Sequence, residues 1–363
     1  MHRFNIKGHK HILAKHETTL EFTKDKEVTL NGDCIAGVEA DFDKEKLQSE
    51  FAYPKIEVCL NVGKNRFTFI ATPNKQFNDD NELVFRKTDF LSNRTGGTKA
   101  TKVACDIKKE IRKALQSEEK GYVAVTGLPI EYIFLDFDDT LCDFFGAMQT
   151  CHNQIAKQLA KKYKQPESRF HELLDTADAQ FPKQASAKNK VELFDRHKWF
   201  EWILEKMKIP IIQEEINFWV KGYWACMISN SKKLPYAEEI LQYLSKKYRL
   251  GMITDADGKK EYKLTRIKST GLNDYFESIA FGDELRVVKP HPNMFNYLLR
   301  QFKAKPEQCV MIGDKPWGDL LTAKKMGMMT VWIKHGIYAK QIEEVPDYVD
   351  YVITNLAELK EIL

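Results

Sequence analysis

Short apolar runs separated by helix-length segments fill the chain from about residue 131 onward. Five such runs occur, at 133–137, 251–254, 278–281, 310–313 and 330–333. Apolar runs of four or five residues are typical of strands that are buried on both faces of a sheet. Because helix-length segments lie between most of them, the pattern predicts a doubly wound parallel α/β sheet.

An insertion of about 110 residues separates the first two predicted strands. Its apolar residues recur at helical spacing in four segments, near 143–164, 167–178, 190–208 and 211–230. The insertion therefore predicts an all-helical subdomain, rich in aromatic residues. It hangs on the carboxyl end of the first strand, which is the edge where open parallel sheets bind ligands.

The first 130 residues show a different pattern, in which apolar residues occupy alternate positions. The alternation is clearest at 18–23, 56–60 and 66–70, and turn signals separate these strand-like segments. One helix is expected at about 100–116, where apolar residues recur every four positions. This part predicts an α+β or barrel-like, β-rich domain.

These patterns divide the chain of 363 residues into three expected units. Residues 1–128 form the β-rich domain, and the turn-like stretch Gly127-Leu128-Pro129 ends it. The α/β core consists of 131–142 plus 231–363, and the helical cap of 143–230 is inserted in it. A chain of this length is compatible with two or three domains at roughly 150 residues each.

Composition excludes several functional classes. The chain has 56 Lys+Arg against 52 Asp+Glu, a net charge of +4, which argues against a dedicated nucleic-acid binder. The chain has no run of about 18 apolar residues, so no membrane span is expected. The first ten residues lack the apolar segment of a signal peptide. Seven cysteines without a Cys-x-x-Cys pair predict reduced thiols in a cytoplasmic protein.

Four short motifs lie at the ends of the apolar segments. In chain order they are carried by Asp136 with Asp138, by Thr254, by Lys289, and by Asp314 with Asp319. Asp136 and Asp138 occupy alternate positions of an extended segment, so their carboxylates point to the same side and repel each other. A divalent cation relieves that repulsion, and Mg²⁺ with its hard oxygen ligands is the usual choice beside phosphate.

Each motif alone has an ordinary structural explanation. An isolated Asp-x-Asp is typical of a solvated turn or a helix N-cap, and a lysine after an apolar pair is typical of a surface side chain. The four motifs nevertheless occur in order at the carboxyl ends of apolar segments, and the first directly precedes the insertion. This combination favours an active site over four unrelated turns.

The motifs resemble those of the haloacid dehalogenase-like (HAD) hydrolase superfamily over residues 131–363, whose type 1 helical cap corresponds to 143–230. Similar stretches surround them, at 271–276, 289–292 and 323–328. The resemblance implies a Rossmann-like core in which Asp136 attacks phosphorus to form an aspartyl-phosphate. It implies a general acid and base at Asp138, and because the dehalogenase branch lacks this second acid, its presence favours phosphoryl transfer.

The resemblance also implies a magnesium site and a phosphate site. Mg²⁺ is expected on Asp136, on Asp314 and on the backbone carbonyl of Asp138, while Asp319 is expected beside the metal or beside Lys289. Carboxylate attack on a phosphate anion needs this neutralisation of charge. The magnesium ligand set is therefore assigned to these four acids.

Thr254, Asp255 and Lys289 are the expected phosphate-binding residues. The resemblance implies that Thr254 and Lys289 hold phosphate oxygens and that Lys289 also counters the crowded carboxylates. Asp255 departs from the family, in which many relatives have Asn. An additional acid there would disturb phosphate unless its side chain faces away and only its backbone N–H is used.

The cap is expected to choose the substrate, because it closes over the phosphate and excludes water. Its candidate substrate contacts are Arg196, His197, Trp199, Tyr223 and Trp224. The alternative for the aromatic candidates is the core of the cap, since Phe194, Trp199, Trp202 and Ile203 recur at helical spacing.

Residues from about 4 to 128 resemble a second family, the archaeal domain of unknown function DUF371. The resemblance rests on 8–9, 16–23, 30–35, 89–90 and 94–95, followed by a helix over 99–115. It brings no activity with it and suggests an archaeal source.

The same domain offers weaker candidates for binding. Its candidate metal ligands are His9, His11, His16, Asp33 and Cys34, whose spacing fits no zinc pattern, and exposed strand histidines are the alternative. The segment 94–99 could hold an anion with its backbone N–H groups or form a plain loop and N-cap. The basic residues of 94–113 leave RNA binding open.

The sequence thus predicts a cytoplasmic, Mg²⁺-dependent phosphatase that acts on a small phosphorylated metabolite through an aspartyl-phosphate. A phosphomutase or another phosphotransferase would use the same residues. A third hypothesis is a binding protein whose N-terminal domain recognises nucleic acid or a partner while its hydrolase domain is vestigial. The complete set of motifs favours the phosphatase.

Overall fold

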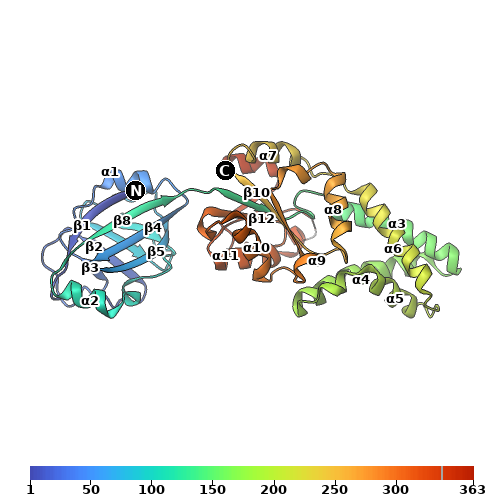
Figure 1. Ribbon diagram of the computed structural model, residues 1–363, viewed down its shortest axis with the longest axis horizontal. Helices are drawn as coiled ribbons and strands as arrows, with labels where there is room; N and C mark the ends of the chain where they lie inside the picture. Colours follow the sequence, from blue (N-terminus) through green and yellow to red (C-terminus); the bar gives the residue numbers. More distant parts are fainter. Residues whose placement is uncertain (337) are drawn as a thin grey trace. The chain divides into compact units, whose positions relative to one another are not determined.

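The computed structural model describes residues 1–336 and 338–363. The chain divides into two compact units, Met1–Pro129 and Ile130–Leu363, each with its own hydrophobic core (Figure 1).

The N-terminal unit is an eight-stranded sheet in the order β1-β8-β4-β5-β7-β6-β2-β3. Its strands are β1 (His2–Lys7), β2 (Thr19–Thr23), β3 (Ile35–Gly37), β4 (Lys55–Val62), β5 (Asn65–Pro73), β6 (Glu82–Arg86), β7 (Thr95–Thr98) and β8 (Lys120–Leu128). The sheet curls until its two edges meet, where the backbones of Lys7 and Val38 exchange hydrogen bonds of 2.9 and 3.0 Å. The apolar core lies on the concave side of the sheet, and the unit is β-rich as predicted.

Two helices complete this unit, α1 (Lys44–Glu50) and α2 (Lys109–Gln116). The helix expected over 100–116 is therefore shorter than its apolar spacing predicts. The segment before it makes a 3₁₀ turn at Ala104–Asp106, in which the Asp106 carboxylate accepts the Val103 N–H at 2.8 Å. Val103 and Ile107 are buried from extended backbone, so core packing rather than helical periodicity explains their spacing.

The core of the second unit is a parallel six-stranded sheet in the order β11-β10-β9-β12-β13-β14, which confirms the predicted fold class. Its strands are β9 (Tyr132–Leu135), β10 (Arg249–Thr254), β11 (Ser278–Phe281), β12 (Cys309–Gly313), β13 (Met329–Ile333) and β14 (Tyr351–Ile353). Leu135 pairs with Met252 on one side and Ile312 on the other. The carboxyl ends of β9, β10 and β12 therefore meet at one edge of the sheet.

Helices cover both faces of this sheet. They are α7 (Ala237–Leu244), α8 (Lys260–Ser269), α9 (Gly282–Leu285), α10 (Pro292–Phe302), α11 (Leu321–Met326), α12 (Tyr338–Gln341) and α13 (Leu359–Ile362). Ile133 and Leu135 face a core shared with α7, α8 and α13, whereas Tyr132 and Phe134 face α10 and α11. Alternate residues of a buried strand thus serve two apolar cores.

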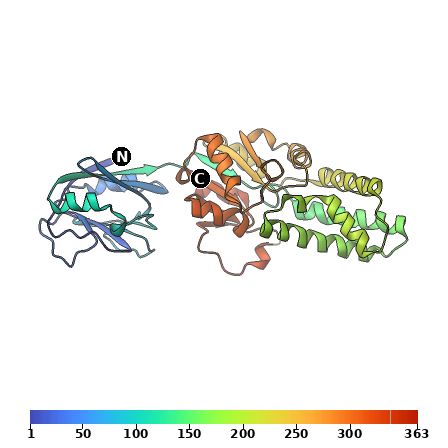
Figure 2. The same cartoon turned by 60° about the horizontal axis from the view of Figure 1, so that its bottom comes forward.

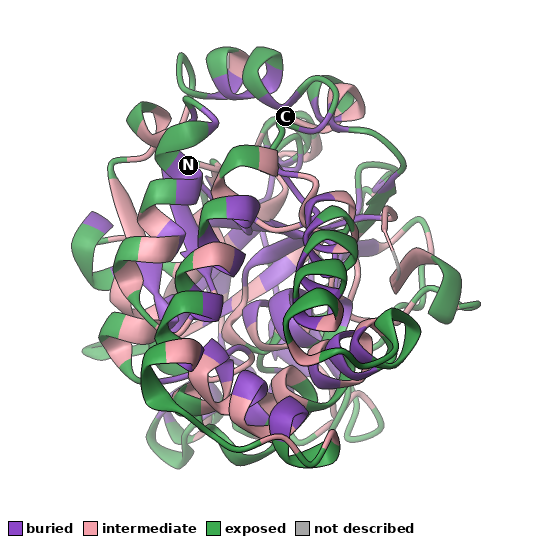
Figure 3. Ribbon diagram, turned by 90° about the vertical axis from the view of Figure 1, so that its right-hand side faces the viewer, coloured by how far each residue is buried: buried purple, intermediate pink, exposed green. Residues whose placement is uncertain are grey.

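The cap consists of α3 (Phe144–Tyr163), α4 (Glu167–Lys188), α5 (Arg196–Lys206) and α6 (Gln213–Asn230), which lie side by side (Figure 2). Buried residues line the inner sides of these helices and exposed residues the outer sides (Figure 3). Helix α4 continues through Pro182, ten residues beyond the predicted end at 178. Ala185 near its end packs with Phe194, Ala256 and Val288, so contact with the α/β core supports the extension.

Two of the seven cysteines are not free thiols. Cys151 of α3 and Cys226 of α6 form a disulfide, with their Cα atoms 5.7 Å apart. The expectation of seven reduced thiols is therefore wrong at this pair, because two neighbouring cap helices bring the side chains together. Separately, in the part of the chain that the structure describes, no helix is both long and apolar enough to cross a membrane.

Candidate active site

The two central strands place two of the predicted acids side by side. Asp136 follows β9, and its N–H donates to the Ile312 carbonyl at 3.0 Å. Asp314 follows β12, and its N–H donates to the Thr140 hydroxyl at 3.1 Å, while its carbonyl accepts the Trp332 indole N–H at 2.9 Å. Backbone hydrogen bonds thus fix the position of both acids at the edge of the sheet.

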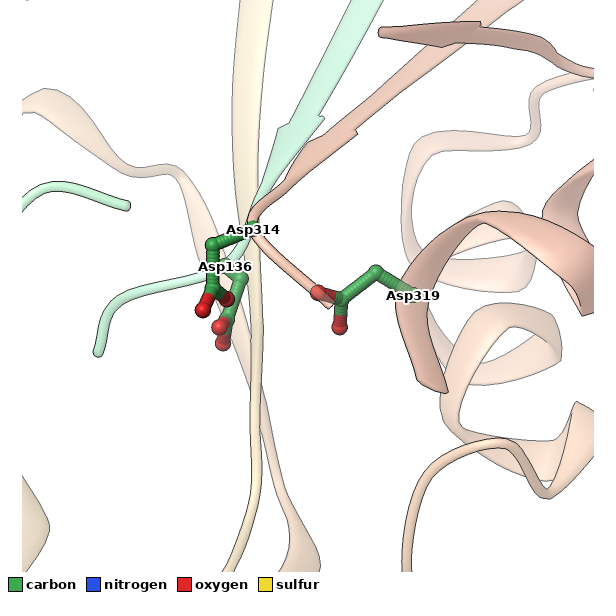
Figure 4. Close-up of side chains that lie close together, drawn as sticks. All are labelled: Asp136, Asp314 and Asp319. Carbon is green, nitrogen blue, oxygen red and sulfur yellow. The ribbon is translucent and has the colours of Figure 1, made fainter. Parts of the chain in front are cut away.

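Asp319 completes a cluster of three buried carboxylates with Asp136 and Asp314. Oxygen atoms of the three lie within 4.8 Å of one another, and Figure 4 shows Asp319 reaching toward the other two. Gly313 permits this approach, since a Cβ atom at that position would lie 2.3 Å from Asp319 Oδ2. The Lys289 ammonium lies 2.7 Å from Asp136 Oδ1 and 2.7 Å from Asp319 Oδ1.

The cluster holds more negative charge than Lys289 can balance. Burial raises the pKa of Asp136 to about 7 despite the opposing attraction of Lys289. Burial, with the charges of Asp319 and Asp136, also raises the pKa of Asp314 well above its ordinary value. Three hard oxygen donors with an excess of negative charge are a donor set that fits Mg²⁺.

Asp138, the remaining acid of the expected magnesium set, turns its carboxylate elsewhere. Arg266 Nη2 lies 2.6 Å from Asp138 Oδ1, and the Lys263 ammonium contacts Oδ2. Both cations also contact Asp257, each at 3.1 Å. Burial by itself would raise the pKa of Asp138. The positive charges of Arg266 and Lys263 have the larger, opposite effect, so the pKa lies below its ordinary range.

The expected phosphate-binding residues lie around this edge. Thr254 ends β10, and among the described residues its buried Oγ1 has no hydrogen-bond partner. The Asp255 carboxylate accepts the Lys289 N–H at 2.9 Å, so one of its oxygens is occupied by the backbone. The structure therefore gives this unusual acid a local role in holding the loop that carries Lys289.

A cavity of about 1010 Å³ opens between the core and the cap. Its core side includes Asp136, Asp138, Lys289 and Asp314, and its cap side includes Arg196. The Arg196 guanidinium stacks 3.5 Å from the centre of the Trp199 ring and donates to the Phe194 carbonyl at 2.9 Å. Of the cap candidates, Arg196 thus reaches the space above the carboxylates.

The other cap candidates do not line this cavity. Tyr223 and Trp224 are each 1% exposed and pack in the core of the cap, as does Trp199, because the apolar side of each helix is turned inward. Trp224 stacks on Tyr262 at 4.9 Å. His197 contacts Asp195 and Asn217 instead. The structure corrects the expectation that Tyr223 and Trp224 face the substrate.

Sequence reasoning missed the charged residues of α8 and the loop before it. Lys263 and Asp257 line the cavity, and Arg266 lies directly behind them. No motif spacing marks them in the sequence, and only the structure shows that α8 buries Lys263 and Arg266 together with Ile267 on its inner side. Two cations at positions where a core helix needs apolar residues indicate buried partners of opposite charge.

The N-terminal candidates do not come together as a site. The rings of His9 and His11 lie 5.1 Å apart, and the His11 backbone N–H donates to His9 Nδ1 at 3.2 Å. His9 also contacts Glu27, His11 the Val28 carbonyl and Cys34 Glu21, and among the described residues the five candidates supply no group of three that could hold a metal ion. The segment 94–99 is neither an anion-binding loop nor an N-cap, because Thr95–Thr98 forms strand β7. Gly96 packs closely on the core, since a Cβ atom there would lie 2.4 Å from Leu83 Cδ1 and the leucine side chain would have to move.

Comparisons with known proteins agree with this architecture. Residues 132–333 match the family "Haloacid dehalogenase-like hydrolase", and residues 4–128 match "Domain of unknown function (DUF371)". The glyceraldehyde 3-phosphate phosphatase of Pyrococcus furiosus is 31% identical over 239 residues, which cover 64% of this chain and 93% of that protein. Human N-acylneuraminate-9-phosphatase is 25% identical over 64% of this chain and 94% of its own length.

A solved structure supports the fold. The HAD-hydrolase YfnB from Bacillus subtilis, described as bound to magnesium, aligns with a TM-score of 0.52 and 19% identity over 65% of this chain and 99% of that one. The chain therefore belongs to the haloacid dehalogenase-like hydrolase family, as an enzyme with phosphatase relatives whose hydrolase domain is fused to an N-terminal DUF371 domain.

Proposed function

We propose that this chain is a Mg²⁺-dependent phosphatase that hydrolyses a small phosphomonoester through an aspartyl-phosphate on Asp136. One observation carries the proposal. Asp136 is buried against Lys289 at the bottom of the cavity, and a second carboxylate, Asp138, lines the same cavity two residues away. Hydrolysis through a covalent intermediate needs a nucleophile and a separate group that moves protons.

The reaction takes two displacements at phosphorus. A carboxylate oxygen of Asp136 bonds to phosphorus while the bond to the ester oxygen breaks, and protonated Asp138 donates its proton to that oxygen. Water then attacks the aspartyl-phosphate, Asp138 takes a proton from it, and phosphate departs from the restored Asp136. The incoming phosphate brings negative charge beside Asp138 and so raises its low pKa toward the protonated state that the first step requires.

Charge neutralisation lets the carboxylate approach the phosphate. Lys289 and Thr254 hold phosphate oxygens, and the unpartnered, buried hydroxyl of Thr254 among the described residues supports this role. Asp136, Asp314 and the Asp138 backbone carbonyl would hold Mg²⁺, with Asp319 supporting Lys289. When bound, Mg²⁺ would supply positive charge that offsets the repulsion between the carboxylate nucleophile and the phosphate.

The substrate is a small phosphorylated metabolite, for which glyceraldehyde 3-phosphate is the first candidate. The name of the Pyrococcus furiosus relative supports this choice, since that protein matches over most of its length. Arg196, which lines the cavity from the cap, would contact the part of the substrate opposite the phosphate. A cytoplasmic location in an archaeon is part of the proposal. The disulfide is compatible with it, because some intracellular proteins of archaea contain disulfides.

The test is phosphate release by the purified full chain with Mg²⁺, from p-nitrophenyl phosphate and from glyceraldehyde 3-phosphate. Asp136→Asn should lower kcat by a factor on the order of 10³ or more, because the nucleophile is lost. Asp274→Asn is the matched control, since this acid is exposed and lies outside the cavity lining. Full activity of the Asp136→Asn protein would contradict the proposed mechanism.

A further inference from the structure

Four charged side chains form a buried network beside the three-carboxylate cluster. Asp138 and Asp257 alternate with Lys263 and Arg266, so that each acid contacts both cations. The side chains of Lys263, Arg266 and Asp257 are 1%, 0% and 4% exposed, whereas that of Asp138 is 24% exposed. The network therefore presents mainly one carboxylate, that of Asp138, to the cavity.

The two cations contact both oxygens of that carboxylate, and Arg266 reaches Oδ2 as well through Nη1 at 3.5 Å. Arg266 Nη2 contacts Oδ1 at 2.6 Å, and Lys263 contacts Oδ2. A carboxylate held at both oxygens from two directions cannot rotate about its terminal bond without breaking a charged hydrogen bond. Buried ion pairs add little net stability, because desolvation offsets their attraction, but they do fix geometry.

Arg266 is itself anchored where the cap joins the core. Its Nε donates to the Ser231 hydroxyl at 3.2 Å, directly after the end of α6. Its guanidinium lies 5.5 Å from the centre of the Phe137 ring and 5.1 Å from that of Phe144, the first residue of α3. Arg266 thus contacts both connections to the cap as well as Asp138.

We propose that Lys263 and Arg266 are positioning residues that hold the Asp138 carboxylate toward the leaving-group oxygen. The proposal rests on the phosphatase function above, in which Asp138 transfers the proton. Without Arg266, Oδ1 loses its 2.6 Å contact, and without Lys263, Oδ2 keeps only the 3.5 Å contact to Arg266 Nη1. In either variant the side chain samples orientations that do not reach the leaving group. Both cations also lower the pKa of Asp138, so their removal favours the protonated acid. A positioning role requires that the lost orientation outweighs this gain, so that proton donation fails more often.

Two aryl phosphates isolate this step. Phenyl phosphate and p-nitrophenyl phosphate present the same phosphoryl group, but phenolate is the more basic leaving group and depends more on a donated proton. Because kcat/KM covers only the steps up to departure of the leaving group, the ratio of the two kcat/KM values reports proton donation. The fraction of folded enzyme cancels in this ratio, since both substrates are measured on one preparation.

The variants are Arg266→Met, Lys263→Met and Arg266→Lys in the full chain, with Lys260→Met as the matched control. Lys260 lies on the same helix but pairs with Glu284 at the surface. For Arg266→Met and Lys263→Met we expect kcat/KM for phenyl phosphate to fall about tenfold or more beyond the fall for p-nitrophenyl phosphate. Arg266→Lys should lie between wild type and Arg266→Met, and Lys260→Met should keep the wild-type ratio.

An equal fall for both substrates in all three network variants would overturn the positioning role, since it would mean a general loss of structure. If Arg266→Met gives no folded protein, Lys263→Met and Arg266→Lys decide by the same ratio. A wild-type protein that releases phosphate neither from the two aryl esters nor from glyceraldehyde 3-phosphate would overturn the phosphatase function, and the positioning role with it. Activity with an unchanged ratio overturns the positioning role alone.

Discussion

Three buried carboxylates lie together at the end of the central strands, and two of them contact the ammonium group of Lys289. Asp136 and Asp319 each lie 2.7 Å from it, and Asp314 completes the cluster. Charges are costly to bury, so burial raises the pKa values of Asp136 and Asp314, and the charges of neighbouring carboxylates raise them further. The fold therefore carries a local electrostatic strain that a divalent cation would relieve.

Asp314→Asn should change stability in two opposite ways. The pKa of Asp314 is raised in the folded state, so the folded protein loses stability as the pH rises above the pKa that this carboxyl has in the unfolded chain. At pH 8 without Mg²⁺, the Asp314→Asn variant should therefore unfold at a higher temperature than wild type. Mg²⁺ at a hundredfold excess over its Kd should raise the wild-type Tm by about 5–10 °C for a unit of this size. It should raise the Tm of the variant less, because one ligand is gone.

Thermal unfolding followed by calorimetry, with and without Mg²⁺, measures both effects. Asp274→Asn again serves as control and should respond to Mg²⁺ as wild type does. An equal Mg²⁺ response in wild type and Asp314→Asn would show that this cluster does not bind the ion.

The four motifs could be read from the sequence because each follows an apolar segment whose strand character is local. The ends of parallel strands meet at one edge, so Asp136, Thr254 and Asp314 could be placed together without coordinates. The partners of Asp138 could not, since they lie on a helix with no motif spacing. The cap residues that contact substrate were harder to predict, because an aromatic residue at helical spacing fits equally well in a core or in a cavity wall. Trp224, which is buried in the core of the cap, is an example.

At the scale of elements, buried parallel strands were predicted well and curved antiparallel strands less well. The five core strands carry continuous apolar runs, whereas β14 is a short edge strand with Tyr351 and Val352 exposed. In the N-terminal unit, β7 consists of Thr-Gly-Gly-Thr, which has no apolar alternation at all. Such strands are set by pairing across the sheet, and local sequence does not encode that pairing.

The cap is stabilised by a feature that joins two of its elements. The disulfide between Cys151 of α3 and Cys226 of α6 closes a loop with a sequence separation of 75 residues. Replacing both cysteines by alanine should lower the free energy of unfolding of the cap by about 2–4 kcal/mol, because the unfolded chain gains freedom. Calorimetry of the double variant against wild type measures the loss.

Thiol alkylation tests the disulfide itself. In denaturant without reductant, intact mass should show five alkylated cysteines, and with reductant it should show all seven. Seven alkylated cysteines before reduction would rule out the disulfide.

At the scale of the whole molecule, every residue assigned to catalysis lies in the unit Ile130–Leu363. That unit has its own sheet core and its own cap core, so it has the packing that an independently folding domain needs. The N-terminal unit has a separate core and matches a different family. The division indicates that the chemistry and the function of the DUF371 domain are separable.

A chain that starts at Ile130 should therefore keep the kcat/KM of the full chain for p-nitrophenyl phosphate with Mg²⁺. Calorimetry supplies the control, because the transition of the catalytic unit should appear at the same temperature in both proteins. Lower activity at an unchanged transition temperature would mean that the N-terminal unit contributes to the active site. Lower activity together with a lower transition temperature would mean that it stabilises the catalytic unit, and either result would contradict separability.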